Sequence, residues 1–130
     1  MRTALFLLAL LALAPAARAQ QALDGTEWKL KYAEASGPLM SARVDYLMFD
    51  AGKMASARMI PKGFEPTGYD DKFRAEEIEW RSRQRNADGL RLEWEGKRSG
   101  DAMEGTVRRE DAEGNVREYR WKATLNHPGD

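Results

Sequence analysis

Short turns recur along residues 25–125 and divide this stretch into segments of similar length. Gly-containing turn candidates fall every 8 to 15 residues, among them 50–52, 87–89, 100–101 and 112–114. Tight hairpins need such small, polar, Gly-bearing sequences because their central residues adopt backbone conformations that larger side chains disfavour. Between the turns, apolar and charged residues alternate, which is typical of half-buried strands. The spacing therefore predicts an antiparallel β-meander.

Eight strands are expected in the meander. They are placed at residues 26–33, 43–50, 53–60, 69–75, 78–86, 90–99, 102–111 and 115–125. A meander of this size leaves two edges unpaired unless it closes into a barrel. The sequence thus predicts an all-β fold, an antiparallel up-and-down β-barrel of about eight strands. Helix-forming residues are frequent at 73–80, so a short helix there is the alternative.

Charge pairing between neighbouring strands indicates their register, because residues directly opposite each other point to the same face of a sheet. A three-residue loop at 87–89 places Arg81 opposite Glu95. The last hairpin, with a similar loop, places Gly105 opposite Trp121. Gly105 is then expected to leave space for the indole ring.

For the hairpin around residue 100, two turn positions are compatible with the alternation of inward and outward residues on the two strands. A turn at 100–101 sets Glu93 opposite Arg108, whereas a turn at 99–100 sets like charges opposite each other. Since like charges in direct opposition are unfavourable, the turn at 100–101 is predicted.

The second strand is ambiguous because both of its faces carry apolar residues. A two-residue turn at 51–52 pairs Asp50 with Lys53. The sequence does not decide which of two sets on the preceding strand points inward: Val44, Tyr46 and Met48, or Leu47 and Phe49.

Residues 1–19 have the pattern of a secretory signal peptide. Arg2 precedes an apolar run at 4–14, and Ala17-Arg18-Ala19 provides a cleavage site with small residues. The run is short for a permanent membrane anchor, which needs about 20 residues. We expect cleavage after Ala19 and an exported, periplasmic or secreted, single-domain barrel at 20–130; the alternative is a retained N-terminal anchor helix. The chain has no Cys that could carry a lipid.

The charge balance excludes some classes of partner. Removal of Arg2 and Arg18 leaves 19 basic residues against 21 acidic ones, a net charge of −2. Nucleic-acid binders instead carry a basic excess on one face. No nucleic-acid partner is therefore expected, and no stable membrane insertion after signal cleavage.

Residues that support catalysis or metal binding are scarce. The chain has no Cys and one His, His127, which follows the last strand in an expected flexible tail. No nucleophile, proton-transfer or metal-ligand pattern appears. Glu93 and Glu95 are interpreted as members of a salt-bridge ladder on the charged face, because arginines lie opposite them. We predict a protein that is not an enzyme, with no metal and no cofactor.

The inward face supplies the candidate ligand-binding residues. These are Trp80, Trp94, Trp121, Tyr119, Ser82 and Gln84. Large aromatic side chains either fill a small barrel or line a pocket together with a few polar groups. Ser56 and Arg58 are further candidates for inward polar residues. Phe64, in the long loop at 61–68, is expected to act as a lid or as a plug.

Several segments carry a resemblance to a known group of proteins. They are Leu23-Asp24-Gly25-Thr26-Glu27-Trp28, residues 46–49 with Gly52 and Lys53, residues 100–106, and residues 119–125. In these segments, which extend over nearly the whole mature chain, the protein resembles small, exported, uncharacterised bacterial lipocalin-like (calycin-type) β-barrels. The resemblance implies binding of a small, partly apolar molecule.

The expected function is thus a non-catalytic, exported β-barrel that binds a small, partly apolar ligand. The alternative is a protein-interaction module, such as a barrel-type protease inhibitor or an envelope adaptor. A filled interior would favour the alternative over a carrier.

Overall fold

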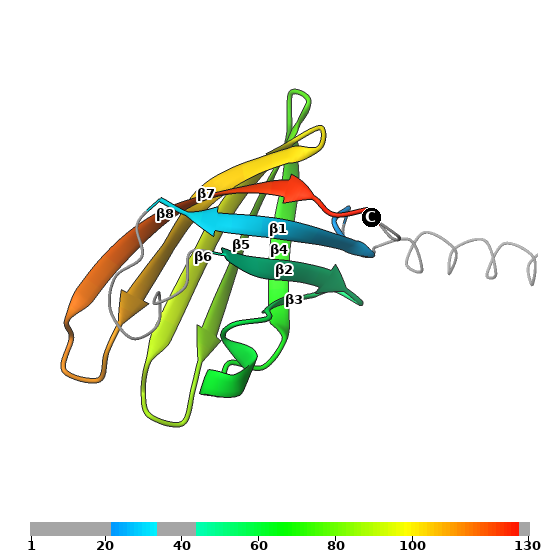
Figure 1. Ribbon diagram of the computed structural model, residues 1–130. Coiled ribbons are helices and arrows are strands. Elements are labelled where there is room, and N and C mark those ends of the chain that lie inside the picture. Colours follow the sequence, from blue (N-terminus) through cyan, green and yellow to red (C-terminus); the bar gives the residue numbers. More distant parts are fainter. Residues whose placement is uncertain (1–21, 34–43, 128–130) are drawn as a thin grey trace, which may run out of the picture.

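A computed structural model of the protein describes residues 22–33 and 44–127. The expected signal peptide at 1–19 lies outside the described residues. The described strands form one closed antiparallel barrel, in which each strand pairs with its neighbours in sequence and β8 pairs with β1 (Figure 1). The all-β, eight-stranded up-and-down barrel is therefore confirmed.

The strands have the following bounds: β1 Thr26–Tyr32, β2 Val44–Asp50, β3 Lys53–Ser56, β4 Thr67–Arg74, β5 Glu77–Arg85, β6 Arg91–Ser99, β7 Ala102–Glu110 and β8 Val116–Leu125. A single 3-10 turn, η1 (Ile60–Lys62), lies between β3 and β4.

The register predicted from charges is confirmed. Arg81 lies opposite Glu95, and Glu93 lies opposite Arg108. Gly105 lies opposite Trp121. Complementary charges across exposed faces thus identify the pairing of β5, β6, β7 and β8.

The third strand is shorter than predicted. It ends at Ser56, and the chain then turns into η1, so the expected strand at 53–60 is wrong in its second half. Pro61 stands at the start of the 3-10 turn, where its missing N–H is harmless, and Gly63 ends the turn with a φ of 92°. The turn carries Met59 and Phe64 into the barrel, where both are fully buried.

Residues 73–80 form strand and turn, so the helical alternative is wrong. Phe73 pairs with Ile78 across a hairpin whose tip contains Ala75 at a φ of 55°. Pairing of β5 with β6 from Ile78 to Arg85 outweighs the helix propensity of this segment.

The ambiguous second strand points Asp45, Leu47 and Phe49 inward, all of them buried. The opposite set faces outward, and its Tyr46 is 37% exposed. An inward carboxylate is tolerated here because four donors surround it, as described below.

Buried side chains close both ends of the barrel. Leu23, just before β1, is fully buried at one end. Phe64, between η1 and β4, is fully buried at the opposite end and belongs to the same core. Phe64 therefore acts as a plug in this structure, which is one of the two roles expected for it.

Candidate functional site

All six candidate ligand-binding residues lie inside the barrel wall and are buried. Trp94 is 0% exposed, and the most exposed of the six, Tyr119, is 6% exposed. They come from β5 (Trp80, Ser82, Gln84), β6 (Trp94) and β8 (Tyr119, Trp121). The structure brings the four aromatic candidates into one hydrophobic core with side chains from the other strands, and it buries Ser82 and Gln84 as well.

The polar candidates have hydrogen-bond partners within the protein. Gln84 accepts a hydrogen bond from Trp94 Nε1 at 2.9 Å and donates one from Nε2 to the carbonyl of Glu65 at 3.1 Å. Ser82 Oγ donates to the carbonyl of Gly68 at 2.8 Å. These side chains therefore tie β5 to β6, to β4 and to the segment that precedes β4.

The tryptophans pack against one another over two glycines. The ring centroids of Trp80 and Trp121 are 6.1 Å apart, and those of Trp94 and Trp121 are 6.4 Å apart. A Cβ atom on Gly96 would lie 2.3 Å from Trp80 Nε1, and one on Gly105 would lie 2.7 Å from Trp121 Cζ2. The two glycines thus make room for two indole rings on the inner side of the sheet.

One indole N–H stays without an acceptor. Trp121 Nε1 is buried and has no hydrogen-bond partner among the described residues. Trp80 Nε1, in contrast, lies 3.3 Å from the sulfur of Met103. A buried donor without an acceptor costs about 1–3 kcal/mol, so Trp121 Nε1 is the one atom of the six candidates that would gain from an added acceptor.

A buried carboxylate that the sequence analysis did not select organises the end of the barrel near η1. Asp45 Oδ1 accepts hydrogen bonds from the backbone N–H groups of Tyr46 at 2.7 Å and Arg58 at 3.0 Å. Its Oδ2 accepts from Tyr32 Oη at 2.9 Å and from Ser56 Oγ. Burial, followed by the Asp45 charge, raises the pKa of Tyr32.

Ser56 therefore points inward, as expected, and its partner is a protein carboxylate. Arg58 is exposed and does not lie in the core; its Nε donates to the carbonyl of Val44 at 3.1 Å. The position of Asp45 on the same side of its strand as Leu47 and Phe49 was the only signal that could have indicated an inward carboxylate.

The opposite end has a similar polar cluster. Asp24 accepts hydrogen bonds from the backbone N–H of Gly52 at 3.0 Å and from Tyr69 Oη at 2.8 Å. Burial and this hydrogen bond raise the pKa of Tyr69. Asp24 thereby holds the segment that carries the Leu23 plug against the turn between β2 and β3.

A depression of about 1170 Å³ lies on the outside of the barrel. We call it the outer groove. It crosses six adjacent strands, each contributing three consecutive residues. Its floor is the backbone of one cross-strand row: Tyr32, Trp121, Gly105, Gly96, Trp80 and Asp71.

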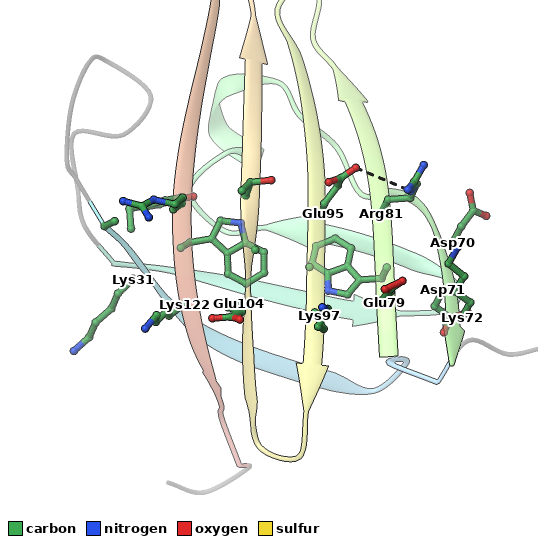
Figure 2. A pocket seen from close by; sticks show the side chains of 18 residues that line it. Lys31, Asp70, Asp71, Lys72, Glu79, Arg81, Glu95, Lys97, Glu104 and Lys122 are labelled. Carbon is green, nitrogen blue, oxygen red and sulfur yellow. Dashed lines mark ion pairs between the residues drawn. The ribbon is translucent and has the colours of Figure 1, made fainter. Parts of the chain in front are cut away.

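The residues before and after each floor position point outward and form two rims. Figure 2 shows Arg81 and Glu95 on one side of the floor, and Lys97, Glu104 and Lys122 on the other. Six strands at about 4.8 Å spacing make the groove roughly 24 Å long. That length matches an extended polypeptide segment of about seven residues.

The charges on the rims differ between the two ends of the outer groove. On β5 and β6 they compensate each other, for example Arg81 and Glu95 at 3.9 Å. On β8 and β1 the rim carries Arg120, Lys122 and Lys31. In the described part of the chain, no three or more His, Cys, Asp or Glu side chains are grouped so that they could hold a metal ion.

Over residues 22–33 and 44–127, no helix has the length and apolar character of a membrane-spanning segment. Comparison of the chain with protein-family models, curated proteins and solved structures finds no match. The functional argument below therefore depends on the residues and the geometry of this chain.

Proposed function

We propose that this protein is a non-catalytic, exported interaction module that binds a protein partner with the outside of its barrel. One observation carries the proposal: the barrel interior is occupied by its own buried side chains, while a depression of about 1170 Å³ lies on the outer surface. An envelope adaptor or a barrel-type inhibitor fits this arrangement better than a carrier.

Three features support recognition by the outer wall. The inward polar residues Ser56, Ser82 and Gln84 bond to the protein itself, so they need no ligand. Leu23 and Phe64 occupy the two ends through which a ligand would enter. The outer groove, in contrast, is open and long enough for a peptide segment.

Export and the finer fold class belong to the same proposal. The signal-peptide pattern at 1–19 supports a periplasmic or secreted location. The lipocalin-like, calycin-type subclass is supported by Gly25 and Trp28 at the start of β1. Trp28 is fully buried, and the guanidinium of Arg98 lies 5.0 Å from the centroid of its ring.

Photo-crosslinking from the groove tests the proposal. Benzoylphenylalanine replaces Thr106, a rim residue on β7, and in a control it replaces Arg85, an exposed β5 residue outside the groove. We expect the Thr106 variant, incubated with the envelope fraction of its native cells, to give one discrete protein adduct that the Arg85 variant lacks. The same adducts from both variants, or none, would contradict the proposal.

A second candidate function is a carrier of a small, partly apolar ligand, and a specific observation favours it. Trp121 Nε1 is a buried donor without an acceptor, which a ligand carrying an oxygen would satisfy. Its test is a titration of ¹⁵N-labelled protein with an isoprenoid alcohol. A saturable shift of the Trp121 indole N–H signal supports a carrier, and an unchanged signal at saturation excludes this ligand class.

A further inference from the structure

Four cations lie side by side on the outward faces of two paired strands. They are Lys29 and Lys31 on β1, and Arg120 and Lys122 on β8, and we call them the cationic strip. Lys31 stands directly opposite Lys122 in the ladder. Like charges in direct opposition destabilise a sheet, so this pairing is unfavourable for the isolated barrel.

The cationic strip has fewer ion pairs than the face formed by β5, β6 and β7, although Glu104 on β7 stands opposite Lys122 in the ladder. No ion pair joins any of its four residues to a carboxylate among residues 22–33 and 44–127. On the face formed by β5, β6 and β7, in contrast, Arg81 and Arg108 each lie within 4.0 Å of a glutamate. The difference between the two faces lies in these ion pairs, because like charges also stand opposite each other elsewhere, as Arg85 does to Arg91.

An apolar row borders the cationic strip. The outward residues of β2 are Val44, Tyr46 and Met48, followed by Asp50 at the end of the strand. In the ladder, Lys29 stands opposite Tyr46, and Lys31 stands opposite Val44. Outward apolar residues on consecutive alternate positions are unusual for a barrel strand with one solvated face.

We propose that the cationic strip and the outward row of β2 bind an acidic polypeptide segment of the partner, one that carries apolar residues between its carboxylates. This inference rests on the proposed function, because Lys31, Arg120 and Lys122 also form one end of the outer groove. Carboxylates of the segment would occupy the positions that glutamates occupy on the opposite face. Its apolar residues would cover Tyr46 and its neighbours.

The geometry favours a polypeptide over an anionic membrane surface. Tyr46 is only 37% exposed, and Val44 and Met48 are half-buried within the sheet. Membrane-surface binding needs apolar side chains that project into the headgroup region. A polypeptide can instead lie along the shallow row and place its carboxylates next to the lysines.

The probe is a fluorescein-labelled peptide of alternating Glu and Leu, compared with a peptide that has Gln in place of Glu. Anisotropy titrations use the mature protein at low and high salt. The acidic peptide is expected to bind, more weakly at high salt because screening shortens the range of the attraction. The Gln peptide is expected to bind at least roughly tenfold more weakly.

Two double variants locate the interaction. Lys31→Gln with Lys122→Gln removes the opposed pair, and its unfolding midpoint should be unchanged or higher, because a repulsion is lost. Arg83→Gln with Arg85→Gln removes the same charge from β5, outside the strip. The first pair is expected to weaken binding of the acidic peptide roughly tenfold, and the second to change it less than about twofold.

Several outcomes would overturn the inference. They are equal binding of the two peptides, equal weakening by the two double variants, or no binding of the acidic peptide. Binding of phosphatidylglycerol vesicles that is lost in the Lys31/Lys122 variant, without peptide binding, would identify a membrane surface instead. A crosslinked partner that contacts Thr106 through a basic segment would refute the inference and leave the proposed function intact.

Discussion

The inner and outer sides of one cross-strand row have opposite properties. On the inner side of Trp80, Gly96, Gly105 and Trp121, two indole rings lie over two glycines in the buried core. On the outer side, the backbone of the same residues is the floor of an open groove with charged rims. The packing of the interior therefore depends on how well the side chains fit together, whereas the exterior is accessible to a binding partner.

This difference determines where substitutions should matter. An inner residue has neighbours on all sides, so a change of volume or the loss of a hydrogen bond affects folding. An outer residue contacts water and a few charges, so its loss affects stability little and binding more. The following predictions test this contrast.

The largest effect is expected at Gly105. A Cβ atom there would lie 1.9 Å from the carbonyl oxygen of Glu95, which is backbone and can move only with its strand. We expect Gly105→Ala to lower the free energy of unfolding by about 4 kcal/mol. The control is Gly68→Ala, since a Cβ on Gly68 has no neighbour nearer than 3.9 Å. Urea denaturation measures both, and similar losses would contradict the packed row.

A smaller effect is expected at Gln84. Gln84→Leu leaves Trp94 Nε1 and the Glu65 carbonyl without their partners in the core, at an expected cost of about 2 kcal/mol. Arg83→Leu, at the neighbouring outward position, should cost less than about 1 kcal/mol. If thermal denaturation ranks these two variants in the opposite order, Gln84 does not bridge β6 and the loop.

The buried Tyr32 on the inner side should make the stability of the barrel depend on pH in the alkaline range. Burial raises the pKa of Tyr32 above its ordinary value of 10.0. The unfolded chain therefore loses this proton first, so the stabilisation is complete below pH 10 and decreases above it. The slope is up to about 1.4 kcal/mol per pH unit for each such tyrosine.

Urea midpoints measured across the alkaline range test this assignment. Tyr32→Phe should make the decline shallower. Identical slopes in the wild type and the Tyr32 variant would show that Tyr32 does not contribute to the alkaline loss of stability.

The smallest effect is expected on the ion-paired outer face. Arg108 lies 3.2 Å from Glu110 and 3.7 Å from Glu93, and all three side chains are partly exposed. Arg108→Gln should change the free energy of unfolding by less than about 1 kcal/mol, and added salt should reduce this difference. A loss of stability comparable to that of Gln84→Leu would contradict the difference between the inner and outer sides of the barrel.

Much of the barrel could be predicted from the sequence because two local signals agree. Alternation of apolar and charged residues identifies strands, and charge complementarity across hairpins identifies their register, as for Arg81 with Glu95. Both signals depend on residues close in sequence. They were sufficient for β5, β6, β7 and β8.

The features that the sequence did not predict depend on long-range contacts. The inward face of β2 is set by donors from β1, β3 and the segment after β3, which gather around Asp45. The early end of β3 follows from the burial of Met59 and Phe64 in the far end of the core. The outer groove arises from six strands together, and no single segment indicates it.

The central claim is that the interior holds the protein's own side chains and that recognition takes place outside. A titration of the mature protein with 1-aminoanthracene, an apolar dye that fluoresces in dry cavities, tests it most directly. The account predicts no saturable increase in dye fluorescence and no quenching of the tryptophans. Saturable one-to-one binding that also quenches tryptophan emission would show that the barrel is a container and would contradict the account.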